Sequence, residues 1–243
     1  HDRLYRCGSD HSFADLVERV SPAVVSVQVD VERGMQPSAA PDIPAPTPIV
    51  RHHDIYIVSD EVYEHIIFDG AAHESMSRHP ELAARSFVVG SFGKTFHVTG
   101  WKIGYVVAPA ALTAELRKVH QYVTFSTMTP VQHGIADLLS DEKGLNELPS
   151  FFQRKRDLFL QLMEGSRFTP LPCRGSYFQL MDYSAISDLA DAEFAIWLTR
   201  EHGVASIPTS PFLSKTRAPQ VVRFCFAKKD ETLERAAERL RRV

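Results

Sequence analysis

From residue 54 onward, the hydrophobic pattern predicts strands that alternate with helices. Short apolar runs predict strands over 55–58, 87–90 and 103–107. Apolar residues at helical spacing follow at Leu112, Leu116, Val119 and Val123. Pro130 interrupts this pattern, which resumes from Val131 to Leu139 and again over 152–162. The sequence therefore predicts an α/β fold.

The last seventy residues predict a smaller α/β unit. The expected strands are 177–181, 205–207 and 221–226, and the expected helices are 193–200 and 233–240. We expect three parts: residues 1–52, a large domain over 53–145 and a small C-terminal domain over 146–243.

The first fifty residues differ from the rest of the chain in their hydrophobic pattern and proline content. Ser12 can cap a short amphipathic helix, and the alternation from Val25 to Val31 predicts a half-buried strand. Five of the 15 prolines then fall within residues 37–48, which is typical of a linker.

Composition narrows the function class. The chain of 243 residues is 44% apolar and 23% charged, and its net charge of −3 gives no electrostatic footprint for nucleic acid. No apolar run approaches the roughly 18 residues that span a bilayer. The 3 cysteines are far apart, so neither a disulfide framework nor a metal site is expected. No signal pattern is visible, and we expect a cytoplasmic protein without a membrane or nucleic-acid partner.

Two residues follow strands at positions suited to a ligand site. Asp60 follows directly after the expected strand 55–58 and Ser59. Ligands of open α/β sheets bind beyond the carboxyl ends of strands, so Asp60 is well placed for a site. The alternative is that Ser59 or Asp60 only caps a turn. Lys94 lies in the Gly-Ser loop 90–95 among aromatic residues, which disfavours its charged form and suits a nucleophilic amine; the alternative is an exposed loop lysine.

Two further cations complete the candidate site. Lys102 lies at the mouth of the next strand, where it either binds an anion or faces solvent. Arg223 is centred in an apolar strand, and by the two-residue period it faces away from Val222 and Phe224. A carboxylate is its best geometric match, supplied either by a substrate or by an ion pair within the fold.

These residues belong to longer motifs that resemble those of a known family. The motifs are Ser-Asp-Glu-Val-Tyr-Glu-His at 59–65, Ser-Phe-Gly-Lys-Thr-Phe-His-Val-Thr-Gly-Trp-Lys-Ile-Gly-Tyr at 91–105, Gly-Ser-Tyr-Phe at 175–178, Asp-Tyr-Ser at 182–184 and Arg-Phe-Cys-Phe-Ala-Lys-Lys at 223–229. From residue 53 to 240, the chain resembles the C-terminal half of fold-type I, pyridoxal-phosphate-dependent aminotransferases of class I/II, most of all the methionine and kynurenine types.

The resemblance implies a role for each site residue. Lys94 would bind the aldehyde of pyridoxal 5′-phosphate and carry the substrate proton. Asp60 would pair with the ring nitrogen, Tyr63 with the ring hydroxyl oxygen, and Ser91 with the phosphate. Lys102 would also contact the phosphate, at a position where many family members have arginine. Arg223 would hold the carboxylate of the amino acid or 2-oxo acid substrate.

The resemblance also implies a homodimer and a preference for methionine or aromatic amino acids. Five aromatic residues could line a pocket for such substrates, although we expect ordinary core packing for them. They are Phe92, Trp101, Tyr122, Phe125 and Tyr177.

Relative to the family, the chain is truncated upstream of the Asp60 strand. Because each βαβ unit needs roughly 30 residues or more, residues 1–52 cannot replace that half. We therefore expect a sheet with an unpaired edge and an uncovered apolar face. Two functions remain open: an aminotransferase, or a catalytically dead fusion fragment that inherited these residues.

The front segment has a resemblance of its own. Residues 12–31 are similar to the opening of trypsin-like periplasmic stress proteases, but no Gly-Asn-Ser-Gly-Gly motif follows. Protease activity is not expected, and a fusion of two gene fragments is the simplest interpretation.

Overall fold

A computed structural model describes residues 24–25, 55–140, 142–213 and 220–243. The helix and the linker expected within residues 1–52, and most of the strand expected over 25–31, lie outside these residues. The chain divides into two compact units, which are described separately. Unit 1 comprises His1–Val62 and Glu74–Leu138, and unit 2 comprises Tyr63–His73 and Leu139–Val243. The three-part division expected from the sequence stays a prediction.

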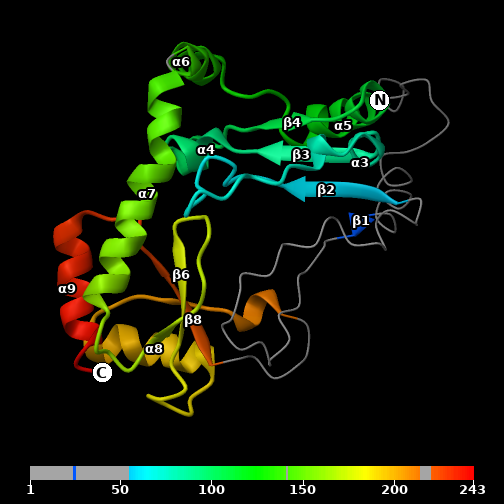
Figure 1. Ribbon diagram of the computed structural model, residues 1–243. Helices are drawn as coiled ribbons and strands as arrows, with labels where there is room; N and C mark the ends of the chain where they lie inside the picture. Colours follow the sequence, from blue (N-terminus) through cyan, green and yellow to red (C-terminus); the bar gives the residue numbers. More distant parts are fainter. Residues whose placement is uncertain (1–23, 26–54, 141, 214–219) are drawn as a thin grey trace, which may run out of the picture. The chain divides into compact units, whose positions relative to one another are not determined.

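Unit 1 contains a four-stranded mixed sheet in the order β1-β2-β3-β4 (Figure 1). Its strands are β1 (Val24–Val25), β2 (Tyr56–Asp60), β3 (Ser86–Gly90) and β4 (Tyr105–Val107). β2 pairs in parallel with both β1 and β3, whereas β4 runs antiparallel to β3. The three apolar runs expected to be strands are confirmed, with shifts of one or two residues.

The helices of unit 1 fill the connections between these strands and continue after β4. They are η2 (Met76–Arg78), α3 (Pro80–Ala83), α4 (Phe92–Thr95), η3 (Thr99–Trp101), α5 (Ala110–Val123) and α6 (Thr129–Leu139). The predicted break between two helices is confirmed, because α5 ends at Val123 and Pro130 lies in the first turn of α6. A proline is tolerated there because the first helical N–H groups have no intrahelical partner.

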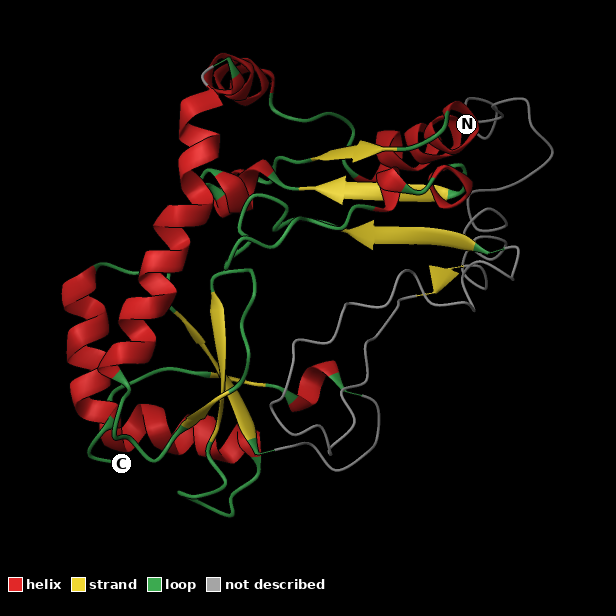
Figure 2. Cartoon of the chain, viewed as in Figure 1, coloured by secondary structure: helices red, strands yellow, loops and turns green. Residues whose placement is uncertain are grey.

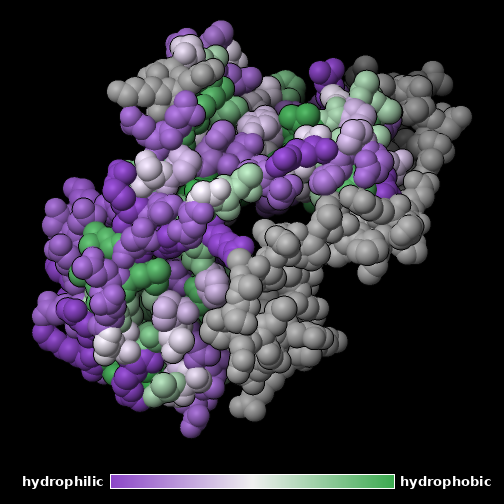
Figure 3. All heavy atoms as spheres, viewed as in Figure 1, coloured by the Kyte–Doolittle hydropathy of each residue, from purple (hydrophilic) through white to green (hydrophobic). Residues whose placement is uncertain are grey.

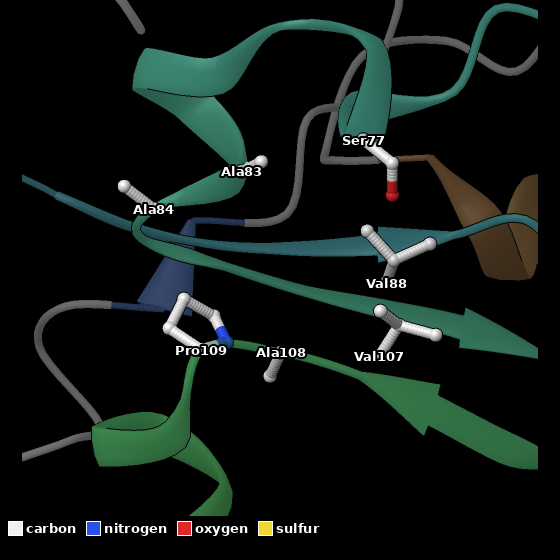
Figure 4. A pocket seen from close by; sticks show the side chains of 7 residues that line it. All are labelled: Ser77, Ala83, Ala84, Val88, Val107, Ala108 and Pro109. Carbon is white, nitrogen blue, oxygen red and sulfur yellow. The ribbon is translucent and has the colours of Figure 1, made fainter.

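One face of the unit 1 sheet is packed under η2 and α3. Ile57 on β2 and Val88 on β3 are buried there, together with Leu82 of α3. Beside them lies a shallow hollow of about 340 Å³ (Figure 4). It is lined by Ser77, Ala83, Ala84, Val88, Val107, Ala108 and Pro109. None of the residues expected to act in catalysis lines this hollow.

Unit 2 contains an antiparallel sheet in the order β5-β6-β8-β7 (Figure 2). Its strands are β5 (Thr169–Pro170), β6 (Phe178–Asp182), β7 (Ile207–Pro208) and β8 (Val221–Cys225). Its helices are α7 (Glu142–Leu162), α8 (Asp191–His202), η4 (Ser210–Phe212) and α9 (Asp230–Leu240). Val222 and Phe224 of β8 join one core cluster with residues of all three long helices, among them Phe159, Phe194 and Leu233.

The three long helices of unit 2 begin earlier than the sequence pattern predicts, whereas its strands β6 and β7 begin one and two residues later. α7 begins ten residues before the expected start at 152, and it contains Pro149 in its interior. Proline removes one backbone hydrogen bond and is unusual inside a helix, so the start of α7 differs from the prediction. The chain between Tyr63 and His73 also packs in unit 2, although unit 1 both precedes and follows it.

The described part of the chain was searched for membrane spans and metal-binding clusters of side chains. None of its helices combines the length and the apolar character that a bilayer crossing requires. In the same part of the chain, His, Cys, Asp and Glu side chains form no group of three or more that could hold a metal ion. Figure 3 shows hydrophobic side chains at the surface among hydrophilic ones.

Candidate active site

Four of the predicted site residues lie at one edge of the unit 1 sheet. Asp60 is the last residue of β2, and Ser91 directly follows β3. Because β2 and β3 are parallel neighbours, their carboxyl ends meet at the same edge. Lys94 follows on α4, and Lys102 precedes β4, whose first residue pairs with the last residue of β3. The sheet topology thus brings together a carboxylate, a hydroxyl and two amines.

The Asp60 side chain is exposed, and one of its carboxylate oxygens accepts a hydrogen bond within a local turn. The backbone N–H of Val62 donates to Asp60 Oδ1 over 3.4 Å, which agrees with the turn-capping alternative. The next residue, Glu61, is 6% exposed, and its Oε1 accepts hydrogen bonds from Ser59 Oγ at 2.8 Å and Met76 N at 2.9 Å. The Glu61 N–H also donates to the carbonyl of Val89. These bonds fix the backbone on which Asp60 sits.

Ser91 caps the short helix that carries Lys94. Its Oγ accepts from the Lys94 N–H at 3.3 Å, and its carbonyl accepts from Thr95 N and Thr95 Oγ1. Serine is favoured at this position because its side-chain oxygen satisfies an N–H that the helix leaves free. The Ser91 hydroxyl proton is still available to a ligand, since its oxygen acts here as an acceptor.

Lys94 is half-buried rather than fully exposed. Phe92 and Phe96, which flank Lys94 in the sequence, stack on each other with ring centroids 6.3 Å apart. The Phe92 ring also contacts the Tyr105 ring, with centroids 5.1 Å apart. Among the described residues, no carboxylate forms an ion pair with the Lys94 amine. An amine in partly apolar surroundings, without a counter-ion, suits nucleophilic chemistry.

Two glycines allow the backbone of β3 and the segment before β4 to lie in direct contact. A Cβ on Gly104 would come within 2.5 Å of the Gly90 carbonyl oxygen, and a Cβ on Gly90 would collide with the Tyr105 ring. Only glycine fits such an approach. This contact holds the loop of Lys102 against the loop of Ser91.

Lys102 has a left-handed backbone. Its φ of 54° and ψ of 48° end the short helix η3, and its side chain is exposed. For residues other than glycine, this left-handed region of φ and ψ is small and rarely occupied. The turn therefore positions the Lys102 side chain at a strained point directly before β4.

The other two predicted site residues lie in unit 2, and both lie next to the Phe178 ring. The Arg223 guanidinium stacks on the Phe178 ring at 4.0 Å and lies 5.4 Å from the Phe212 ring. Tyr63 meets Phe178 edge-on at 6.4 Å and Tyr177 at 5.1 Å. Phe178 thus links Tyr63 to Arg223 within this unit.

Arg223 keeps its hydrogen-bonding capacity. Its Nε is buried without a hydrogen-bond partner, and among the described residues no carboxylate pairs with it. The ion pair expected as one alternative is therefore not formed with any described residue. Stacking on aromatic faces holds the guanidinium plane and leaves its edge for a planar anion.

A buried carboxylate anchors the loop that carries Phe212. Asp191 is 4% exposed and accepts hydrogen bonds from Ser210 N at 2.6 Å, Ala192 N at 2.9 Å and Thr209 Oγ1 at 3.5 Å. Burial alone would raise the pKa of Asp191, but these hydrogen bonds outweigh it and lower the pKa. Sequence reasoning missed Asp191, because a first-turn acid of a helix carries no signal of its distant partners.

The prediction for the five aromatic residues is partly wrong. Trp101, Tyr122 and Phe125 are 55%, 65% and 84% exposed, so they do not pack in a core. Tyr177 is buried in the unit 2 core, as expected, and Phe92 is half-buried. Phe178 and Phe212, which flank Arg223, were not singled out, since a single apolar residue in a strand or loop carries no signal of which side chain it contacts.

Comparison with known proteins adds the family context. Residues 41–240 match the family model of aminotransferase class I and II. A methionine aminotransferase of Escherichia coli (strain K12) is 53% identical over 192 residues, which is 79% of this chain and 50% of that protein. The kynurenine–oxoglutarate transaminase 3 of Mus musculus is 35% identical over 206 residues, covering 76% of this chain and 45% of that protein.

Solved structures agree in fold. A crystal structure from Escherichia coli, described as identifying a methionine aminotransferase function, superimposes with a TM-score of 0.75 at 53% identity. The superposition covers 79% of this chain and 51% of that one. The chain thus spans about half the length of the relatives it matches.

Proposed function

Since the chain belongs to the class I and II aminotransferases, we propose that it exchanges an amino group between an amino acid and a 2-oxo acid, with pyridoxal 5′-phosphate bound at Lys94. The single observation that carries this proposal is the gathering of Asp60, Ser91, Lys94 and Lys102 at the carboxyl edge of β2 and β3. Methionine or an aromatic amino acid is the proposed donor, because the matched relatives bear the names methionine aminotransferase and kynurenine–oxoglutarate transaminase.

The donor set at this edge fits the cofactor. An amine suits its aldehyde, an exposed carboxylate suits its ring nitrogen, and a hydroxyl together with a cation suits its phosphate. The close contact of Gly104 with the Gly90 carbonyl holds the backbones of these loops together. When bound, pyridoxal phosphate supplies an electron-withdrawing ring that stabilises negative charge on the substrate α-carbon.

Each of these residues of unit 1 would have its own role in binding the cofactor or in moving the proton. Lys94 holds the cofactor and afterwards carries the proton that leaves the α-carbon, because a free amine is a suitable general base. Asp60 keeps a proton on the ring nitrogen by charge attraction. Ser91 donates its hydroxyl proton to the phosphate, and Lys102 neutralises it as a point charge without the planar fork of arginine.

The residues of unit 2 would bind the substrate and the ring hydroxyl. Arg223 receives the substrate carboxylate in two parallel hydrogen bonds, which its aromatic stacking on Phe178 orients. On the resemblance to the family alone, Tyr63 would donate its hydroxyl proton to the ring oxygen of the cofactor. We also propose a homodimer and a cytoplasmic location, on the resemblance to the family alone.

The test is covalent capture of the cofactor. The purified chain is incubated with pyridoxal phosphate and reduced with borohydride, and the modified peptide is mapped by mass spectrometry. We expect one label per chain at Lys94, lost in Lys94→Ala and kept in Lys118→Ala, a control lysine that is exposed and paired with Glu115. Scattered labelling of surface lysines would contradict the proposal.

A catalytically inactive fragment is the second candidate, because the chain spans only about half of its relatives. Release of the 2-oxo acid from methionine separates the two. Specific labelling of Lys94 without any release would favour the inactive fragment.

A further inference from the structure

The orientation of the Arg223 guanidinium depends on the Phe178 ring. In the register of β6 with β8, Phe178 lies opposite Cys225, and Leu180 lies opposite Arg223. Phe178 and Arg223 are therefore diagonal neighbours on one face of the sheet, within reach of each other's side chains. The guanidinium stacks on the ring at 4.0 Å, and its Nε has no hydrogen-bond partner among the described residues. A change in the position of Phe178 should thus be passed on to Arg223.

The backbone of Phe178 is held by a thiol. Cys173 Sγ lies 3.2 Å from the Phe178 carbonyl oxygen and 3.2 Å from the Gly175 carbonyl oxygen, so its one proton is shared between two acceptors. Burial raises the pKa of the Cys173 thiol, which keeps this donor protonated at neutral pH. Close by, Leu171 N donates to the Leu180 carbonyl. Cys173 thus connects the segment before β6 to the first residue of β6.

The backbone of Cys173 is held in turn by Arg156 of α7. Arg156 Nη1 donates to the Cys173 carbonyl over 2.8 Å, and both Nη atoms donate to the Asp69 carboxylate over 2.7 Å. Arg156 Nε donates to Asp157 Oδ1, and the residue is 8% exposed. With every nitrogen engaged, Arg156 holds its neighbours in place and is not available to bind a substrate anion itself.

One series of contacts therefore leads from Arg156 to Arg223. We propose that Arg156 is a positioning residue for Arg223. It fixes Cys173, whose thiol fixes Phe178, and the Phe178 ring orients the guanidinium. This inference rests on the proposed function, in which Arg223 holds the substrate carboxylate. Two parallel hydrogen bonds to a carboxylate need a correctly directed guanidinium plane, so a shift of Phe178 should weaken substrate binding.

Four variants of the full chain test the contacts one by one. Arg156→Lys keeps the charge but lacks the planar fork that binds Asp69 and the Cys173 carbonyl together. Cys173→Ala removes the thiol and leaves the pair of Arg156 with Asp69 in place, whereas Cys173→Ser keeps a donor at the same position. Arg154→Lys is the matched control, because Arg154 is an exposed residue of the same helix.

The first measurement is the NMR spectrum of the Arg223 side chain, with isotope-labelled arginine and an assignment from Arg223→Lys. Protons that stack on an aromatic ring are shifted by its ring current, so the Arg223 signals report the contact with Phe178. We expect ring-shifted signals in the original chain, in Arg154→Lys and in Cys173→Ser. The shift should be smaller in Arg156→Lys and in Cys173→Ala.

The second measurement is calorimetric binding of 3-phenylpropionate, a carboxylate without an amino group. We expect its dissociation constant to rise about fivefold in Arg156→Lys and in Cys173→Ala, and less than about twofold in Cys173→Ser. Arg156→Lys combined with Cys173→Ala should bind no more weakly than either variant alone, because both act through the same contacts. Thermal melts confirm that each variant folds, and Cys173→Ala keeps the test valid if Arg156→Lys does not fold.

Four results would overturn the proposal. They are unchanged Arg223 signals in Arg156→Lys and Cys173→Ala, equal effects of Cys173→Ser and Cys173→Ala, additive losses in the double variant, and no binding of 3-phenylpropionate by the original chain. Borohydride labelling of Lys94 reports on the proposed function separately. Selective labelling together with any of the first three results would leave the proposed function standing while the positioning role of Arg156 fails.

Discussion

In unit 2, the Arg156 guanidinium binds the Asp69 carboxylate through two parallel hydrogen bonds. Nη1 donates to Oδ2 and Nη2 donates to Oδ1, each over 2.7 Å, although 87 residues separate the pair. Arg156 is 8% exposed, lies over the Phe68 ring at 4.9 Å and also donates to the Cys173 carbonyl. The pair thereby joins α7 to the segment 63–73.

Asp69→Asn tests this junction. Asn keeps the shape and tolerates the left-handed backbone of Asp69, whose φ is 59°, so the substitution removes mainly charge. Because the Asp69 side chain is 53% exposed, we expect a loss of only about 1–2 kcal/mol in the free energy of unfolding. Denaturant titration measures the loss. Asp188→Asn, an exposed acid of the same unit, should change nothing, and equal stabilities of the two variants would contradict the prediction.

The free energy of unfolding of unit 2 should decrease as the pH is lowered. The hydrogen bond from Arg156 holds the pKa of Asp69 below its ordinary value. A lowered folded-state pKa contributes stability above the unfolded pKa, near about 4, and this contribution disappears as pH falls through the folded value. Thermal melts between pH 7 and pH 3 should therefore show a decline below about pH 5 that is smaller in Asp69→Asn. The same decline in both proteins would refute the assignment.

Asp191→Asn should loosen the loop beside Arg223. The carboxylate is buried and accepts from Ser210 N and Thr209 Oγ1, and the amide can replace only part of this. We expect a loss of about 1–3 kcal/mol in stability and faster hydrogen exchange at residues 209–213. If the chain is active, the KM for the amino acid should rise more than kcat falls. Unchanged exchange in the loop would count against the anchoring role.

Gly104→Ala should disrupt the edge that carries Lys94. Its Cβ would press on the Gly90 carbonyl, and overpacking of this kind costs about 1–3 kcal/mol. Gly100→Ala is the matched control, since nothing lies within 4 Å of its Cβ position. Borohydride labelling of Lys94 should decrease only in Gly104→Ala. Equal labelling in the two variants would show that the contact does not support the site.

Lys102→Arg should bind pyridoxal phosphate more tightly. The guanidinium offers two parallel donors to a phosphate where the amine offers a point charge, and the left-handed backbone suits both side chains equally. We expect the dissociation constant to fall about fivefold, or roughly 1 kcal/mol. Titration of the cofactor absorbance measures it, with Lys102→Met as the weakened comparison. A weaker complex in Lys102→Arg would place the phosphate elsewhere.

The strands, the helices and the candidate edge of the unit 1 sheet could be predicted from the amino-acid pattern. Periods of two and 3.6 residues predict strands and helices directly, because both depend on neighbours a few positions away. Asp60, Ser91 and Lys94 follow strands, so their common edge is implied once the strands are known to be parallel neighbours.

The contacts between side chains far apart in the sequence became visible in the folded chain alone. Arg156 binds the distant Asp69 as well as its neighbour Asp157. Arg223 stacks on the rings of Phe178 and Phe212, and Asp191 accepts from Ser210 N. The chain path decided these partners, since the segment 63–73 joins unit 2 between two stretches of unit 1. Partners separated by tens of residues leave no periodic trace, because each side chain obeys its local pattern equally well with any partner that the fold brings near.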